Sequence, residues 1–243
     1  MSNLRVVLVA PRNPLNIGAA ARALTNFGVS QLRLVNPYYV AFRQATSAVG
    51  ATELLAKAVE YKTVGEAVAD CSLVVGTTAV GKRHLLQPLR RLEQGARLIH
   101  KQLRSSNVAL LFGSEKRGLS NEDFSHCHWL MRIPTGEENI SMNLGQAVAV
   151  CLYELARDGK ITAGKKTDYD LSATSGELEQ ITGLLLDSLR ASGYIKSGSA
   201  ANSEEKVRRL IRRLDIPEKD AVVWLGIFRQ ILWKVNAGEK AGR

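Results

Sequence analysis

The sequence predicts an α/β fold built on a parallel sheet, followed by a small all-helical region. In roughly the first 160 residues, short apolar runs of strand length alternate with longer segments that have helical periodicity. These short runs are rich in apolar and β-branched residues, as in strands that are covered on both faces. From about residue 177 onward the chain has helical patterns and no convincing strand. Ligands of such sheets bind beyond the carboxyl ends of the strands, which is where we look for a site.

Five runs have the length and composition of buried strands, and four segments between or after them have periodic apolar faces. The strands are expected over Arg5 to Ala10, Gln31 to Val35, Ser72 to Gly76, Asn107 to Gly113 and Trp129 to Ile133. The helices are expected over Asn16 to Phe27, Glu53 to Val59, Leu92 to Leu103 and Asn143 to Arg157. Alternation of this kind predicts parallel strands with helices on both faces of the sheet.

A polar segment rich in Gly, Lys, Ser and Thr follows Asp158 and divides the chain. We therefore expect a first domain over residues 1–160, a linker over 161–175 and a helical extension over 176–243. Ser192-Gly193 and Asp215-Ile216-Pro217 separate three helical patterns in the extension. Its core is expected to include three aromatic residues at helical spacing, Trp224, Phe228 and Trp233.

The formal net charge of +10 over 243 residues favours a polyanionic partner, and nucleic acid is the leading candidate. A basic enzyme with a solvated surface is the alternative. The cations proposed to contact RNA are Lys82, Arg83, His84, Arg90, Arg91, Arg208, Arg209, Arg212 and Arg213. The last four recur at i, i+1, i+4 and i+5, which predicts one basic helical face or, alternatively, a solvated stripe.

Other sequence features exclude several classes of protein. No apolar run reaches the roughly 18 residues of a membrane span, and the N-terminus lacks the features of a secretory signal, so we expect a cytoplasmic protein. The three cysteines, Cys71, Cys127 and Cys151, are expected to be buried thiols, and no CxxC pair suggests a metal site. His126 and His128 have no partnering ligand motif and are interpreted as structural.

Three polar clusters follow predicted strands. The first, PRNPLNIGAAARAL, is expected to start a helix with Asn16 as N-cap and carries Arg22 six residues later. The second, GSEKRGLSNEDF, places Glu115 between two glycines, where it either serves a site or forms an ion pair with Lys116 or Arg117, before Ser120 caps a helix. The third, IPTGEENISMNLGQAVAV, enters a helix near Asn143. Ordinary capped helices are the alternative explanation for the first and third clusters.

Nucleotide-binding motifs of the commonest kinds are absent from the sequence. No GxGxxG lies at a first strand-to-helix turn, and no GxxxxGK[ST] occurs anywhere in the chain. The turn GTTA, Gly76 to Ala79, follows a strand and offers backbone groups to a small ligand. An α/β protein with this turn and three polar clusters therefore requires a different kind of cofactor.

Together the clusters resemble the TrmH-like branch of the SPOUT methyltransferases, which are RNA 2′-O-methyltransferases. The resemblance rests on NIGAAAR (Asn16 to Arg22), FGSEKRGLSNE (Phe112 to Glu122) and IPTGEENISMNLGQAVAV (Ile133 to Val150), in this order. The helical extension, through LLDSLRASGYI, KVRRLIRRL and LGIFRQIL, is similar to that of the bacterial tRNA (cytidine/uridine-2′-O-)-methyltransferases, the TrmJ group. One departure is Leu15, where relatives often have glycine.

The resemblance implies a trefoil-knotted α/β domain that binds S-adenosyl-L-methionine and works as a homodimer, with no metal. By position, the cofactor pocket would be formed by Thr77, Thr78, Ala79, Gly113, Ile133, Ile140, Ser141 and Met142. The residues implied around the reacting hydroxyl are Asn16, Arg22, Glu115, Ser141 and Asn143.

The implied reaction is 2′-O-methylation of a cytidine or uridine at the 5′-most nucleotide of the tRNA anticodon loop. Because arginine is a poor proton acceptor, we expect Arg22 to hold the adjacent phosphate and stabilise the developing alkoxide. A ribosomal-RNA methyltransferase of the same superfamily and a non-catalytic RNA-binding protein are the alternatives. Cofactor binding separates the last of these from the two enzymes, and the RNA substrate separates the enzymes from each other.

Overall fold

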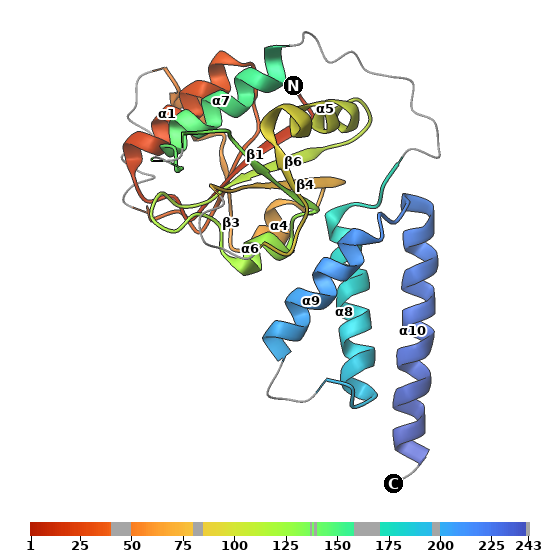
Figure 1. The fold of residues 1–243 in the computed structure, drawn as a ribbon. Coiled ribbons are helices and arrows are strands. Elements are labelled where there is room, and N and C mark those ends of the chain that lie inside the picture. The colour runs from red at the N-terminus through yellow and green to blue at the C-terminus, as the bar shows by residue number, and fades with distance from the viewer. Residues whose placement is uncertain are drawn as a thin grey trace.

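A computed structural model describes residues 1–39, 50–79, 85–136, 138, 140–157, 171–195 and 200–241. Its first part is a seven-stranded sheet in the order β3-β2-β1-β6-β4-β7-β5, with every neighbouring pair parallel (Figure 1). The strands are β1 (Leu4–Val9), β2 (Leu32–Val35), β3 (Val59–Tyr61), β4 (Leu73–Thr77), β5 (Leu89–Arg91), β6 (Val108–Phe112) and β7 (Trp129–Arg132). The parallel sheet and the helical region after it confirm the predicted fold class. The knot remains a prediction.

Helices cover both faces of the sheet and form the second part of the molecule. In the first part they are α1 (Pro14–Asn26), α3 (Thr52–Ala56), α4 (Val64–Ala67), α5 (Leu92–Leu103), α6 (Asn121–Ser125) and α7 (Leu144–Arg157). Figure 1 shows α1, α5 and α7 on one face and α4 and α6 on the other. The second part contains α8 (Ser175–Ala191), α9 (Ala200–Arg213) and α10 (Glu218–Ala241).

The central strands are largely apolar because each face of the sheet has its own core. In β1, Leu4, Val6 and Leu8 join the core beneath α1, α5 and α7, whereas Val7 and Val9 join the core on the side of α4 and α6. The neighbouring strand β6 alternates in the same way. Successive side chains of a strand point to opposite faces, so a strand buried on both sides shows no polar alternation.

The five predicted strands are confirmed, but the sequence reasoning missed β3 and β5. Both have three residues and lie at the two edges of the sheet, where one side lacks a neighbouring strand and an apolar run is not needed. The helix expected over Glu53 to Val59 is correspondingly too long. It ends at Ala56, and Val59 starts β3. The single-turn helix α4 was also missed. It is held by a capping box between Thr63 and Glu66.

The helical region has its own apolar core, and one of the three predicted aromatic residues lies outside it. The core contains Leu178, Ile181, Ile211, Ile216 and Phe228, among others. Trp224 is half-buried and stacks on Phe228, with 5.5 Å between the ring centroids. Trp233 is 62% exposed, so its assignment to the core was wrong. Its helical spacing from Phe228 turns it away from α8.

Two buried arginines of α9 attach the helical region to the α4 and α6 face of the sheet. Arg208 and Arg212 of α9 both donate to the carboxylate of Glu179 on α8, at distances of 2.8 to 3.2 Å. Arg208 also donates to the Ser125 hydroxyl at 3.1 Å, and Arg212 donates to the His126 carbonyl at 3.0 Å. Removing one member of this cluster would leave a buried charge without its partner.

The prediction that Arg208 and Arg212 contact RNA is therefore wrong. Arg208 and Arg212 are 6% and 3% exposed and point into the junction between the two parts of the molecule. Arg209 pairs with Glu205, and Arg213 is exposed. The i, i+4 spacing that predicted a solvated stripe is also the spacing of a face that packs against a neighbour.

At the amino ends of the strands, one carboxylate joins several elements. Asp70 accepts hydrogen bonds from both terminal nitrogens of the buried Arg33, and from Asn107 at 3.1 Å. Arg5 of β1 lies 3.4 Å from the same carboxylate. Burial would raise the pKa of Asp70, but the bonds from Arg33 outweigh it and lower the pKa to about 2. The ionised form of Asp70 thus stabilises the contact between β1, β2 and β6.

Asp70→Asn is expected to lower the free energy of unfolding near neutral pH by about 1 kcal/mol, a figure reduced because the Asp70 side chain is 43% exposed. The folded-state pKa is depressed, so this stabilisation is present above the unfolded pKa of about 4 and is lost as pH falls towards 2. Urea titrations of both proteins should show a difference in the free energy of unfolding that becomes smaller below pH 4. Glu53→Gln, at an exposed helical pair with Lys57, is the control and should leave the midpoint unchanged. A difference that grows at low pH would contradict the assignment.

Candidate active site

A cavity of about 520 Å³ lies at the carboxyl ends of β4, β6 and β7, which are neighbours in the sheet. Its volume is in the range of sites for small molecules and cofactors. The structure places all eight residues predicted for the cofactor pocket in its lining: Thr77, Thr78, Ala79, Gly113, Ile133, Ile140, Ser141 and Met142. Parallel strands bring these residues together, because their carboxyl ends share one edge of the sheet.

The strand ends that form the cavity floor are tied to one another. The hydroxyl of Thr77 on β4 donates to the Leu111 carbonyl on β6 at 2.8 Å, and the Thr78 N–H donates to the Met131 carbonyl on β7 at 2.9 Å. The loop of the third cluster is closed by a bond of 3.2 Å from the Thr135 hydroxyl to the Ile140 carbonyl. These bonds connect the ends of β4, β6 and β7 and close the loop of the third cluster.

The loop after β6 forms one wall and turns back tightly on itself. Gly118 has a φ of +67°, and its N–H donates to the Ser114 carbonyl at 2.8 Å. A Cβ on Gly113 would lie 2.0 Å from the Gly118 carbonyl carbon. Only glycine fits at position 113, because the returning backbone occupies the space of a side chain.

A chain of hydrogen bonds runs along the cavity rim from the second cluster to the third. Glu115 accepts from the backbone N–H groups of Arg12 and Asn13, at 3.1 and 3.0 Å, and from the Asn16 amide at 3.1 Å. The other end of the Asn16 side chain accepts from the Asn143 amide at 2.8 Å. The Asn143 oxygen in turn accepts from the Gly145 N–H at 2.9 Å, at the start of α7.

This chain has one consistent orientation. Partial burial would raise the pKa of Glu115, but hydrogen bonds from backbone N–H groups and from Asn16 outweigh it, so the pKa is lowered and the carboxylate is ionised. An ionised carboxylate only accepts hydrogen bonds, which directs the Asn16 NH2 group towards Glu115 and its oxygen towards Asn143. Glu115 thus holds the loop after β1 through Arg12, Asn13 and Asn16.

The loop after β1 is also set by the backbone. Ala10, the first residue after β1, has a φ of +48°, an uncommon conformation for a residue with a side chain, and it immediately precedes Pro11. Asn13 then caps α1, since its side chain accepts from the Leu15 N–H at 2.9 Å. The prediction that Asn16 is the N-cap was wrong by one turn. Asn16 lies inside the helix, 8% exposed, and its side chain is free to join the chain from Glu115.

Of the five residues predicted around the reacting hydroxyl, four lie together and one lies apart. Ser141 and Glu115 line the cavity, whereas Asn16 and Asn143 lie outside its lining and are joined to Glu115 by the chain of hydrogen bonds. Arg22 is exposed on α1 and is not part of the cavity lining. Sequence reasoning did not assign Ser114, Lys116, Arg117 or Thr135 to the site, although they line the cavity within clusters that the motifs had already marked.

The remaining predicted groups lie elsewhere in the structure. Burial lowers the pKa of His126 and of His128 to about 3, which suits neutral structural residues, and the His128 Nδ1 accepts from the Val74 N–H at 3.1 Å. All three cysteines are buried and unpaired. Arg90 stacks over Trp129, Arg91 pairs with Glu93, and the predicted RNA contacts Lys82, Arg83 and His84 lie outside the described residues. Within the described ranges no metal-binding group of His, Cys, Asp or Glu occurs, and no helix is long and apolar enough to cross a membrane.

Comparison with known proteins identifies the family of the chain. The model of the SpoU rRNA methylase family matches residues 3–153, which include the whole sheet and all three clusters. The chain therefore belongs to the SpoU rRNA methylase family.

The similarity to particular relatives extends over the helical region. The chain is 33% identical to the tRNA (cytidine/uridine-2′-O-)-methyltransferase TrmJ of Escherichia coli K12 over 249 aligned positions, covering 99% of both chains. The crystal structure of TrmJ from Z. mobilis ZM4 superposes with a TM-score of 0.80 at 33% identity, over 93% of this chain and 98% of that one. A probable methylase family protein from Haemophilus influenzae Rd KW20 has a TM-score of 0.60 at 28% identity, over 98% and 99% of the two chains.

Gly113→Ala is expected to abolish high-affinity binding of an adenosyl cofactor, with at least a tenfold increase in Kd. The new Cβ would displace the wall formed by the loop from Gly113 to Gly118. Gly136→Ala is the matched control, because a Cβ there meets nothing within 4 Å and Gly136 lies in another loop of the same region. Calorimetric titration with S-adenosylmethionine measures both. Equal affinity of the two variants would show that this wall does not shape the pocket.

Asn16→Asp tests the oriented chain at the rim. The second carboxylate would face Glu115 where an NH2 group now donates, at a cost of roughly 1–3 kcal/mol in the free energy of unfolding. The loss should shrink at acidic pH, as one of the two carboxylates takes up a proton. Asn121→Asp makes the same chemical change at the exposed start of α6 and should be neutral in urea titrations. Identical stability of all three proteins at pH 7 would argue against the chain.

Proposed function

We propose that the protein transfers a methyl group from S-adenosyl-L-methionine to the ribose 2′-oxygen of a cytidine or uridine in tRNA, at the 5′-most nucleotide of the anticodon loop. The single observation that carries this proposal is the cavity that three loops build beside the oriented chain Glu115-Asn16-Asn143. The similarity to TrmJ over the full chain supports tRNA as the substrate. tRNA modification would place the protein in the cytoplasm.

The cavity suits an adenosyl cofactor in size and in lining. Its apolar side chains, including Ile133, Ile140 and Met142, would contact a planar base, and the backbone and hydroxyls at Thr77 and Thr78 offer polar partners. When bound, S-adenosylmethionine supplies the methyl group that is transferred. The protein then has to hold the ribose hydroxyl in line with that methyl group and to stabilise the charge that develops on the oxygen.

The rim residues are suited to positioning and are poor proton acceptors. Glu115 is ionised, but its lowered pKa and its three N–H donors make it a weak base. It instead fixes the loop after β1 and, through Asn16, the side chain of Asn143 at the start of α7. We assign Ser141, which lines the cavity, to contact with the nucleotide.

Arg22 is assigned to the RNA backbone rather than to the cofactor. It is exposed and outside the cavity lining, so a single chain supplies the cofactor pocket without it. We propose that the active protein is a homodimer and that Arg22 of the partner subunit approaches the rim, where its guanidinium would bind the phosphate next to the methylated ribose. A planar guanidinium binds phosphate through two parallel hydrogen bonds, which an ammonium cannot reproduce.

Ribosomal RNA is a second candidate substrate, because the matched family is described by rRNA methylation. The helical region favours tRNA, since the aligned tRNA methyltransferase includes it and the family match ends at residue 153. A non-catalytic RNA-binding role is disfavoured by the intact cavity and rim, which pure RNA binding does not require.

The test is incubation of the purified protein with unmodified tRNA transcripts and labelled S-adenosylmethionine, followed by nuclease digestion and mass spectrometry. We expect a 2′-O-methyl group on the 5′-most anticodon-loop nucleotide when it is cytidine or uridine. Arg22→Ala should reduce the transfer rate by about 100-fold or more while the cofactor Kd changes less than twofold.

Arg22→Lys separates charge from geometry and should remain strongly impaired. Nearly full activity of this variant, with unchanged RNA affinity, would make bidentate phosphate binding the wrong explanation. Methylation of ribosomal RNA in place of tRNA would favour the second candidate substrate, and absence of cofactor binding would overturn the enzyme assignment.

A further inference from the structure

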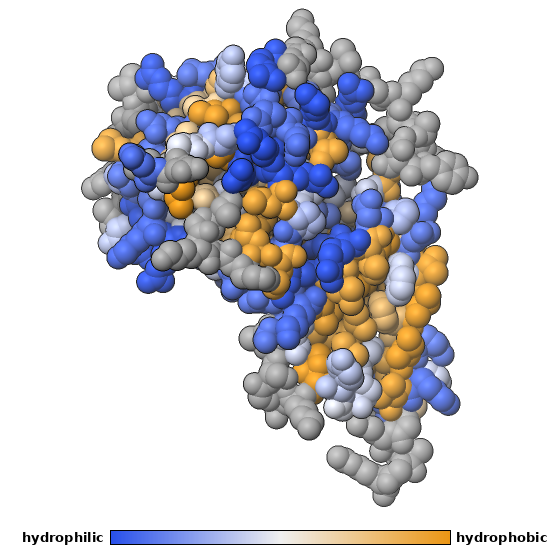
Figure 2. Space-filling view, viewed as in Figure 1, coloured by the Kyte–Doolittle hydropathy of each residue, from blue (hydrophilic) through white to orange (hydrophobic). Residues whose placement is uncertain are grey.

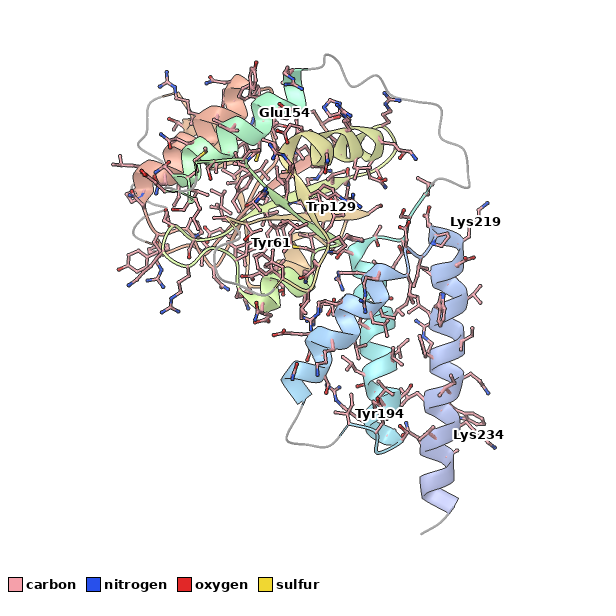
Figure 3. All side chains as sticks on the ribbon, viewed as in Figure 1. Tyr61, Trp129, Glu154, Tyr194, Lys219 and Lys234 are labelled. Atoms are coloured by element: carbon pink, nitrogen blue, oxygen red, sulfur yellow. The ribbon has the colours of Figure 1, made fainter. Side chains whose placement is uncertain are left out.

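The function proposed above does not use the side of α10 that is turned away from α8. The main packing partner of this 24-residue helix is α8, which buries Ala221, Leu225 and Phe228. Figure 2 shows hydrophobic residues gathered along α8 and α10. In Figure 3, Lys219 and Lys234 extend from the side of α10 that is turned away from α8.

Three branched apolar side chains form a continuous row on this helix. Val223, Ile227 and Ile231 follow one another at intervals of four residues and are 59%, 45% and 44% exposed. Asp220 and Lys234 extend the row by three residues at its two ends. At 3.6 residues per turn all five lie within an arc of about 80°. We call these five residues the α10 stripe.

We propose that the α10 stripe binds the α10 stripe of a second copy of this chain, with the two helices antiparallel. A two-fold axis at Ile227 places Val223 of each chain opposite Ile231 of the partner subunit, because both are four residues from the centre. The same axis places Asp220 opposite Lys234 of the partner subunit, seven residues from the centre on either side. The stripe is thus complementary to itself in shape and in charge, as a two-fold interface requires.

The composition of the stripe distinguishes this partner from others. RNA binding needs cations and stacking surfaces, whereas the centre of the stripe carries only aliphatic side chains. A parallel pair of helices would place like charges side by side at both ends. In the antiparallel pair each end carries one acid and one base, which selects orientation and register.

Disulfide trapping tests the centre of the pair in the full-length protein. The three native cysteines are buried, so an introduced surface cysteine is the reactive one. Ile227→Cys lies on the proposed axis and should crosslink to itself under mild oxidation. Val222→Cys is the matched control, because this residue is 68% exposed but lies about 140° around the helix from Ile227. Equal crosslinking of the two variants would overturn the proposal.

Two further cysteine variants test the direction of the helices. Val223→Cys alone should crosslink poorly, because the two copies would be about 12 Å apart along the helix axis, beyond disulfide reach. A mixture of Val223→Cys and Ile231→Cys should crosslink readily as a heterodimer. Efficient self-crosslinking of Val223→Cys with none in the mixture would indicate a parallel pair and overturn the antiparallel register.

Charge reversal tests the ends by sedimentation velocity. Asp220→Lys and Lys234→Asp should each weaken the association by about tenfold, since each sets like charges opposite each other. The double variant restores opposite charges and should return to within about threefold of the unchanged protein. The pairing would be overturned if the single variants associated as strongly as the unchanged protein. It would also be overturned if the double variant associated no more strongly than the single variants.

Maleimide labelling of the Ile227→Cys variant distinguishes a second copy from RNA as the occupant of the stripe. We expect tRNA to leave the labelling rate of the introduced thiol unchanged. Protection of that thiol by tRNA, in the absence of any crosslink, would identify the stripe as an RNA surface and overturn the proposal.

Discussion

The site depends on one carboxylate that three N–H donors hold. Glu115 ties the loop after β6 to the loop after β1 through the backbone of Arg12 and Asn13, and it orients Asn16 towards Asn143. Since an ionised carboxylate cannot donate, every amide along the rim has one orientation. The polar start of α7 is thereby set by a residue about 30 positions earlier in the chain. Without that charge, the loop after β1 would lose its anchor, and the Asn16 and Asn143 amides would no longer have one fixed orientation.

The charged side chains of the protein fall into two groups, those paired inside the structure and those exposed to solvent. A net charge of +10 suggests a basic surface, yet Arg33, Arg208 and Arg212 are used within the structure, where they pair with Asp70 and Glu179. The pair at Asp70 joins strands, and the cluster at Glu179 attaches the helical region to the sheet. Buried arginines of this kind stabilise a particular arrangement of elements, because removing a partner leaves a charge in a low-dielectric environment.

The cavity is formed by residues of a single chain, whereas the proposed methyl transfer also needs a residue outside the cavity. One chain supplies every residue expected to contact the cofactor, because three neighbouring parallel strands end at the same edge. Arg22 is exposed on α1 and lies outside that lining, so a change at Arg22 is expected to leave the cofactor pocket intact. The α10 stripe lies in the helical region, on a different element from Arg22, and self-association through it would be independent of the proposed catalytic dimer.

The sequence by itself determined the central strands and the helical second part, because apolar runs and turn residues are local signals. The residues expected to form the cofactor pocket came from the resemblance of three motifs to a known family, and the structure places them in one cavity. Tertiary structure alone decided what has no local signature. The edge strands β3 and β5 exist because a neighbour pairs with them, and Arg208 and Arg212 are buried because Glu179 and the sheet lie against α9. A periodic row of arginines looks the same in sequence whether water or a carboxylate faces it, because spacing fixes a face of the helix and only the fold fixes what that face meets.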